Sequence, residues 1–174
     1  MQILIVGASG SGTTTLGHAI AKRLSWKHLD LDDDYWVATS PPFQHKRDPA
    51  ERLHRLLADL RSAPDAVASG SPVGWGEPLE DAFDLVVFLY VPAGLRLQRL
   101  QTREVQRYGQ ADPAFLLWAS QYEEGPPEGR SLAKHLAWLT GRKCPVLRIE
   151  GDTSIDERVD SVLEAIRGFD AAPA

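Results

Sequence analysis

The chain has 174 residues, enough to bury a substantial core in one domain; we expect this domain to span residues 1–170, ahead of a short tail, 171–174. A net charge of −5 argues against a protein that mainly binds nucleic acid or an anionic membrane surface. A single cysteine, Cys144, and apolar runs too short to cross a bilayer favour a cytoplasmic protein. We expect it to act as a monomer or homodimer.

Short apolar runs alternate with amphipathic patterns along the chain, as expected for strands that are followed by helices. Strands are predicted at residues 3–6, 28–31, 66–69, 84–91 and 145–149. Helices are predicted from about Thr13, after the cap Asp48-Pro49, from Pro92 to about Tyr108, after the cap Asp112-Pro113, near residues 131–140, and after a cap at residues 153–156.

Repeated strand–helix units predict an α/β fold, in which a parallel sheet is covered by helices on both faces. Ligands of such sheets bind beyond the carboxyl ends of the strands. The residues that fall at these ends include glycines and carboxylates, namely Gly7, Asp30, Asp32 and Gly70.

The segment ILIVGASGSGTTTL predicts a phosphate-binding loop, because a buried strand leads into it and a helix follows it directly. Glycines allow the backbone N–H groups to turn inward, and the start of a helix adds unpaired N–H groups and partial positive charge. The hydroxyl of Thr14 stands where such loops reach Mg²⁺. The residues predicted to bind the nucleotide phosphates are Gly7, Ser9, Gly10, Ser11, Gly12, Thr13, Thr14 and Thr15.

Two other interpretations of this segment stay open. Gly7, Gly10 and Gly12 approximate a dinucleotide (Rossmann-type) loop, and an acidic residue follows about twenty residues on, although the spacing is not G-x-G-x-x-G. The segment would also suit a glycine-rich turn that binds no ligand. The continuation Gly12-Thr13-Thr14 favours the mononucleotide phosphate loop over both.

Thr13 stands where such loops carry a lysine. A neutral hydroxyl replaces a point charge on the β- and γ-phosphates, so nucleotide binding is expected to weaken and phosphoryl transfer to require another cation. Arginines recur on one helical face after the fourth strand, at positions 96, 99, 103 and 107. We predict that Arg99 and Arg103 supply the missing charge.

Carboxylates cluster after the second predicted strand, in the segment HLDLDDDYW. Asp30 and Asp32, two residues apart, are predicted on one face of the strand end, where they would hold Mg²⁺ or take a proton from an attacking hydroxyl. Asp33 and Asp34 fit an acidic, solvated turn. We therefore predict Asp30 and Asp32 as catalytic residues, and Thr14 with Asp32 as metal ligands.

The loop that follows is rich in aromatic and basic side chains, among them Trp36 and Arg47. It would either lie over the crevice and contact a substrate or form a small core of its own, and the same two interpretations apply to Trp75. Trp36 and Arg47 of this loop, with Asp32 before it, are predicted to contact the substrate.

The glycine loop, HLDLDDDYW, SGSP and LRLQRLQTRE together resemble the adenylate-kinase-like group of small P-loop phosphotransferases, and the aspartate pair resembles that of shikimate and gluconate kinases. The resemblance covers most of residues 1–108. It implies a three-layer fold with strand order 2-3-1-4-5, ATP and Mg²⁺ as cofactors, acceptor contacts by Arg47 and Gly70, and a lid region containing Arg99 and Arg103.

Three functions follow as hypotheses. The first is an ATP-dependent kinase that phosphorylates a small molecule, with no nucleic-acid or membrane partner. The second is a nucleotide-binding regulatory module that lacks transfer activity because of Thr13. The third is a Rossmann-like enzyme that binds a dinucleotide.

Overall fold

The computed structural model describes residues 1–40, 44–125 and 129–170, so the predicted tail, 171–174, lies outside the described residues. Five strands form one parallel sheet in the order β2-β3-β1-β4-β5, which confirms the predicted strand order. The strands are β1 (Gln2–Gly7), β2 (Lys27–Asp30), β3 (Ala66–Ser69), β4 (Leu85–Tyr90) and β5 (Val146–Glu150).

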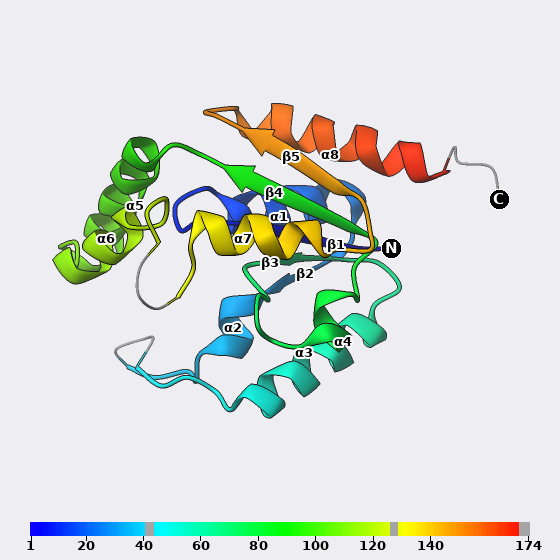
Figure 1. Ribbon diagram of the computed structural model, residues 1–174, viewed down its shortest axis with the longest axis horizontal. Coiled ribbons are helices and arrows are strands. Elements are labelled where there is room, and N and C mark those ends of the chain that lie inside the picture. The colour runs from blue at the N-terminus through cyan, green and yellow to red at the C-terminus, as the bar shows by residue number, and fades with distance from the viewer. Residues whose placement is uncertain (41–43, 126–128, 171–174) are drawn as a thin grey trace.

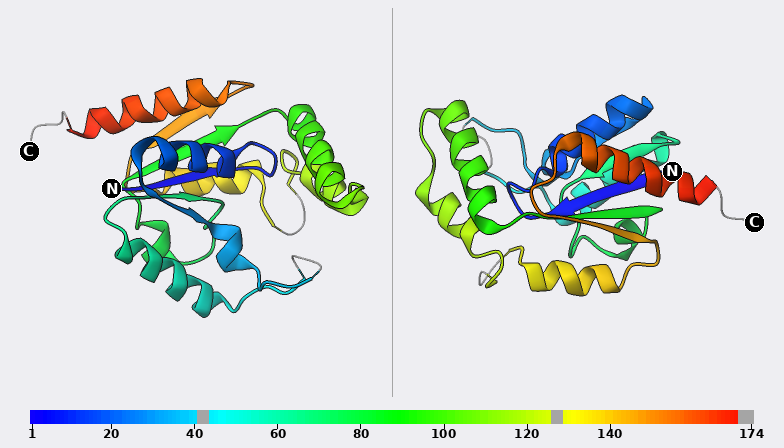
Figure 2. Two further views of the ribbon diagram at one scale, coloured as in Figure 1. Left: turned by 180° about the vertical axis from the view of Figure 1, so that it is seen from behind. Right: turned by 90° about the horizontal axis from the view of Figure 1, so that it is seen from above.

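Helices cover both faces of this sheet, giving the three-layer α/β architecture expected from the sequence (Figure 1). They are α1 (Thr13–Leu24), α2 (Leu31–Tyr35), α3 (Pro49–Ser62), α4 (Glu77–Glu80), α5 (Ala93–Tyr108), α6 (Pro113–Ser120), α7 (Leu132–Thr140) and α8 (Ile155–Asp170). Helices α1 and α8 pack on one face, and α3, α4 and α7 pack on the other. Helices α5 and α6 lie beyond the carboxyl ends of the strands (Figure 2).

The continuous apolar runs of the sequence are explained by this two-sided cover. Along β1, Ile3 and Ile5 contribute to the core beneath α1 and α8, whereas Leu4 and Val6 contribute to the core beneath α3, α4 and α7. A strand buried on both faces needs apolar side chains at every position rather than at alternate ones. All four side chains are fully buried.

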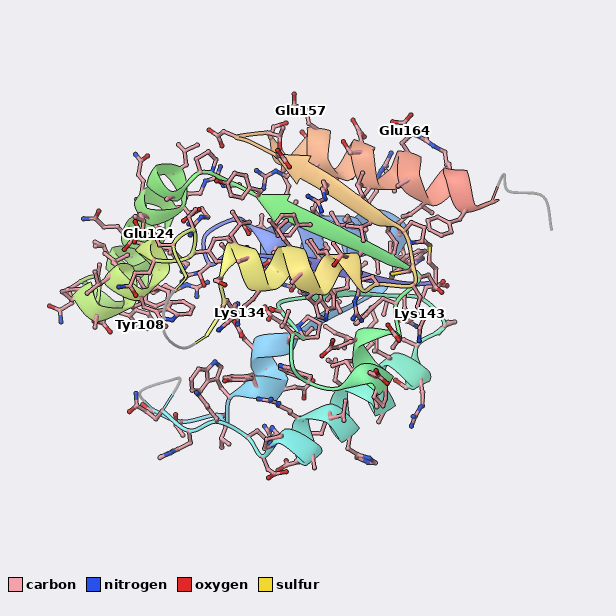
Figure 3. The ribbon with its side chains drawn as sticks, in the orientation of Figure 1. Tyr108, Glu124, Lys134, Lys143, Glu157 and Glu164 are labelled. Carbon is pink, nitrogen blue, oxygen red and sulfur yellow. The ribbon has the colours of Figure 1, made fainter. Side chains whose placement is uncertain are left out.

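Helix starts follow the caps that the sequence predicts. The carboxylate of Asp48 accepts hydrogen bonds from the backbone N–H groups of Ala50 and Glu51 at 2.9 and 3.2 Å, and Asp112 caps α6 in the same way. Ahead of α8, Ser154 and Glu157 bond each other's backbone N–H groups, the reciprocal pattern of a capping box. Figure 3 places Glu157 at this helix start, next to the end of β5.

One local prediction was wrong. The second strand ends at Asp30 instead of continuing to residue 31, and the short helix α2 begins at once. The helix begins there because the carboxylate of Asp30 accepts a hydrogen bond from the N–H of Asp32 at 3.0 Å and so caps the helix. Asp32 is therefore a helical residue and does not share a strand face with Asp30.

Across the described parts of the chain, no helix combines the length and the apolar character that crossing a membrane requires.

Candidate nucleotide-binding site

The loop between β1 and α1 has the backbone geometry of an anion-binding turn. Gly10 and Gly12 adopt left-handed conformations, with φ of 83° and 96°. Gly12 is the N-cap of α1, and no side chain caps this helix. The first N–H groups of a helix have no intrahelical partner and carry partial positive charge, so those of α1 are available to bind an anion. The turn thus suits the phosphate groups of a nucleotide.

The packing around the loop fixes its shape. A Cβ atom on Gly7 would lie 2.6 Å from Ser11 Oγ and 2.7 Å from the backbone oxygen of Leu89. A Cβ atom on Gly10 would lie 2.7 Å from the backbone oxygen of Arg96. The loop therefore packs directly against the end of β4 and the start of α5, and these contacts hold its conformation.

Two buried arginines hold the outward-facing carbonyl groups of the loop. Arg96 on α5 is fully buried, and its Nη1 donates a hydrogen bond to the backbone oxygen of Ser9 at 3.2 Å. Arg158 on α8 is 4% exposed, and its Nη1 donates to the backbone oxygen of Ser11 at 2.8 Å. Carbonyl groups that are turned outward and bonded in this way help to keep the loop conformation fixed.

Sequence reasoning left the role of Arg96 open and missed Arg158. One feature of the sequence does indicate that Arg158 is buried. Arg158 lies three residues after Ile155 and four before Val162, which places a charged residue on the apolar face of α8. A cation at such a position requires buried polar partners.

The carboxylate of Asp30 contacts the start of α1, directly after the loop. Its Oδ2 accepts a hydrogen bond from Thr14 Oγ1 at 3.1 Å, so the predicted magnesium-binding hydroxyl and one predicted catalytic acid lie together. Asp32 is half-exposed and lies 3.5 Å from Nη2 of Arg130. The structure therefore brings Asp30 to Thr14, whereas Asp32, which lies on α2, pairs with Arg130.

The other two acids of this segment differ from each other. Asp34 is buried and pairs with Arg55 at 3.0 Å, so it joins α2 to α3 instead of being solvated as predicted. Asp33 is exposed, and its pKa is raised by partial burial of the carboxyl group and by the charge of Asp30. Within the described residues, no three histidine, cysteine or acidic side chains gather to hold a metal ion.

The arginines predicted to replace the lysine are paired elsewhere. Arg99 forms an ion pair with Asp152 in the loop after β5, and Arg103 pairs with Glu104 at 3.1 Å. Both side chains are partly exposed on α5. Their predicted role in catalysis stays a prediction.

The predicted acceptor-side residues surround α2. Trp36 pairs with Lys46 in an isolated antiparallel bridge. Arg47 donates to the backbone oxygen of Asp34 at 3.1 Å and pairs with Glu51 at 2.7 Å. Gly70 follows β3 with φ of 128°, and a Cβ atom there would lie 2.7 Å from Leu31 Cβ.

Of the aromatic side chains expected either to contact a substrate or to form a small core, Trp75 is buried in the core. Trp75 is 8% exposed and belongs to the core beneath α3 and α4, and its ring stacks on Tyr35 with centroids 5.9 Å apart. The guanidinium of Arg52 lies over both rings, 4.6 Å from the centroid of Trp75 and 4.9 Å from that of Tyr35. Trp75 thus has a packing role.

A buried chain of polar side chains joins the loop after β3 to the arginine beneath the glycine loop. Nε2 and Nδ1 of His135 lie 3.0 Å from Ser71 Oγ and 2.7 Å from the Tyr122 hydroxyl. The guanidinium of Arg96 lies 5.1 Å from the centroid of the Tyr122 ring. Burial, with a smaller contribution from the charge of Arg130, lowers the pKa of His135 to about 4.

This histidine should make the protein less stable in acid. The pKa of His135 is about 4 in the folded chain and 6.5 when unperturbed, so only the unfolded chain takes up the proton between these values. The free energy of unfolding should therefore be unaffected above pH 6.5 and fall as the pH drops towards 4, by at most about 3 kcal/mol from this group. Urea unfolding of the wild type and His135→Gln across this range measures the difference.

The difference in unfolding free energy between the wild type and His135→Gln reports on His135, because the other titrating groups are present in both proteins. His28, whose pKa is also lowered to about 4 mainly by burial, contributes equally to the wild type and the variant and cancels. Equal slopes of stability against pH in the two proteins would show that His135 has the same pKa in the folded and unfolded chains, and would contradict the prediction.

The sequence matches a known family over the region that holds this site. The model of the AAA_18 family, described as an AAA domain, matches residues 3–113, which include the glycine loop and the acids after β2. The chain belongs to the AAA_18 family. A Bacillus subtilis (strain 168) protein named "Uncharacterized protein YqaC" is 46% identical over 173 residues, which cover 94% of this chain and 96% of that protein.

More distant comparisons agree on the fold. A probable gluconokinase of Xenopus tropicalis is 27% identical over 143 residues, covering 67% of this chain and 74% of that protein. Shikimate kinase from Acinetobacter baumannii superimposes with a TM-score of 0.61 at 20% identity, covering 98% of this chain and 95% of that one. A gluconokinase from Sinorhizobium meliloti 1021 gives 0.59 at 16% identity, covering 97% and 92%. This AAA_18 chain thus has the fold of P-loop small-molecule kinases.

Proposed function

We propose that this protein is an ATP-dependent kinase that transfers the γ-phosphoryl group of ATP to a hydroxyl or phosphate group of a small molecule. The observation that carries the proposal is the left-handed glycine turn that opens onto the uncapped start of α1, with Thr14 bonded to Asp30 directly beside it. This arrangement offers N–H groups for phosphates, and a hydroxyl and a carboxylate for a magnesium ion.

The residues present fit a magnesium–nucleotide complex. Mg²⁺ in such sites is held by one or two carboxylates and by the phosphates themselves, so a cluster of three acidic side chains is not required. Thr14 and Asp30, which bond each other, would hold the ion; Asp32, predicted from the sequence as its ligand, pairs with Arg130. The ion would neutralise charge on the transferring phosphoryl group.

The protein's own side chains would then position the acceptor. Asp32 is half-exposed and pairs with Arg130 at 3.5 Å, so its carboxylate is accessible to take a proton from an acceptor hydroxyl. Trp36, Arg47 and Gly70 surround α2, and we propose that they line the acceptor site. Action in the cytoplasm, as a monomer or homodimer, stays a prediction.

The experiment is incubation of the purified protein and Mg²⁺ with ATP labelled on its γ-phosphate and a panel of sugar acids, polyols, hydroxy acids and nucleoside monophosphates. We expect transfer of label to one acceptor class. ATP binding without transfer to any acceptor would instead favour the regulatory module, for which the neutral Thr13 is the motivating observation. Stronger thermal stabilisation by NAD(P) than by ATP–Mg²⁺ would replace both with the dinucleotide enzyme.

A further inference from the structure

The glycine loop lacks a lysine, and two buried guanidinium groups contact it instead. Arg96 binds the carbonyl of Ser9 and Arg158 binds the carbonyl of Ser11, so the two arginines flank Gly10 from α5 and α8. The question is which of them leaves positive charge available to a bound phosphate.

The charge of Arg96 is already compensated. Its Nη2 donates to both carboxylate oxygens of Glu123 at 2.8 Å, a two-point contact that pairs a full positive with a full negative charge. Its remaining hydrogen bonds go to the backbone oxygens of Val91, Ser9 and Ala119. Arg96 therefore fixes the loop but adds little net charge beneath it.

Arg158, in contrast, has only neutral partners. Its Nε donates to Thr153 Oγ1 at 2.8 Å, and its terminal nitrogens donate to the backbone oxygens of Ser11 and Gly151 at 2.8 and 3.4 Å. Within residues 1–40, 44–125 and 129–170, no carboxylate lies within ion-pair distance of this guanidinium. The neighbouring carboxylate of Asp152 is paired with Arg99.

A buried cation without a counter-ion is unfavourable unless an anion can bind near it. Burial and the nearby charge of Arg99 lower the pKa of Arg158, and the charge of Asp152, which lies beyond ion-pair distance, offsets this only in part. A guanidinium nevertheless stays protonated in proteins. A negatively charged ligand on the glycine loop would supply the counter-charge that no carboxylate of the described residues provides within ion-pair distance.

The position of the guanidinium supports this role. Nη1 of Arg158 lies 3.3 Å from where a Cβ atom of Gly12 would stand, and Gly12 directly precedes Thr13. Building on the proposed function, we infer that Arg158 supplies the positive charge of the phosphate loop from α8, in place of the lysine missing at residue 13. Arg99 and Arg103, paired with carboxylates on or beside α5, are not needed for this role.

The test uses calorimetry of ATP and of inorganic triphosphate, each with Mg²⁺, at several salt concentrations. Arg158→Gln should weaken the binding of both ligands about 10–100-fold and reduce the dependence of affinity on salt. Thr13→Lys should restore at least about tenfold of the affinity in the Arg158→Gln protein and improve the wild type much less, because the two cations would serve the same phosphates.

Arg167→Gln is the matched control, because Arg167 is exposed near the other end of the same helix; its affinity and salt dependence should equal those of the wild type. Wild-type affinity in a folded Arg158→Gln protein would overturn the inference and leave the proposed kinase intact. Loss of affinity that Thr13→Lys does not restore would also overturn it, since Arg158 would then act only by holding the loop.

If Arg158→Gln does not fold, Arg158→Lys tests whether the charge of this residue contributes to phosphate binding. Lysine keeps the charge but cannot reach Thr153, Ser11 and Gly151 together, so the salt dependence should remain while affinity falls. Loss of the salt dependence in this variant would overturn the inference. A wild type that binds neither ATP nor triphosphate would defeat the proposed function, and the inference with it.

Discussion

Gly10→Ala should weaken the binding of ATP by at least about tenfold, even though the substitution adds one methyl group and removes no contact. The residue has φ of 83°, which is strained for alanine, and the new Cβ atom would lie 2.7 Å from the backbone oxygen of Arg96 and 3.0 Å from Leu100 Cγ. Strain of this kind costs about 1–3 kcal/mol, so the loop must move away from α5. Calorimetry of ATP binding and thermal unfolding together measure the effect.

Gly94→Ala is the control for this substitution. Gly94 lies in the first turn of α5, and a Cβ atom there would meet no atom within 4 Å. Alanine is favoured over glycine in a helix by about 1 kcal/mol, so this variant should bind ATP normally and be slightly more stable. Equal ATP affinity in Gly10→Ala and Gly94→Ala would mean that the loop conformation does not form the phosphate site.

The parts of the fold that the sequence predicts correctly are those governed by neighbouring residues. The run from Ile3 to Val6 is apolar at each position because both faces of β1 are covered, and this shows in the sequence without any knowledge of the covering helices. The caps at Asp48 and Asp112 likewise act within three residues. Local physics is enough to place these elements.

The missed features depend on contacts that the local pattern does not contain. Helix α2 exists because the side chain of Asp30 turns back to the N–H of Asp32, whereas the same letters also fit a continuing strand. Arg158 meets Ser11 across 147 residues of sequence, so its position on an apolar helix face indicates burial but not the partner.

The separate roles of the arginines of α5 are likewise not visible in the local sequence pattern. Arg96, Arg99 and Arg103 share one helical stripe, and spacing alone does not distinguish them. Tertiary structure separates them, because Arg96 reaches Ser9 and Glu123, whereas Arg99 reaches Asp152 in the loop after β5. Which cation serves a phosphate site is decided by such long-range contacts.

Asp30→Asn should lower phosphoryl transfer by at least about 100-fold and leave the fold intact, because a bound metal ion contributes several kcal/mol to such reactions. Asparagine caps a helix about as well as aspartate, so its amide oxygen should still accept the hydrogen bond from the N–H of Asp32 and α2 should persist. The amide NH2 group then takes the place of Oδ2 and can donate to the hydroxyl of Thr14. What the substitution removes is the negative charge beside the hydroxyl, on which a magnesium ion depends. ATP affinity without Mg²⁺ should therefore be unchanged, while the gain in affinity on adding Mg²⁺ should shrink.

Turnover is measured with the acceptor found in the labelled-ATP panel, or as slow ATP hydrolysis in its absence. Asp33→Asn is the matched control, since it removes the same charge from an exposed position on α2 that bonds neither Thr14 nor the helix cap. It should retain at least about half of the wild-type rate, because a solvated neighbouring charge has little effect on the site. Equal losses in the two variants would show that the summed acidity of this turn, rather than the Thr14–Asp30 pair, serves the nucleotide; no loss in either would remove Asp30 from the proposed reaction.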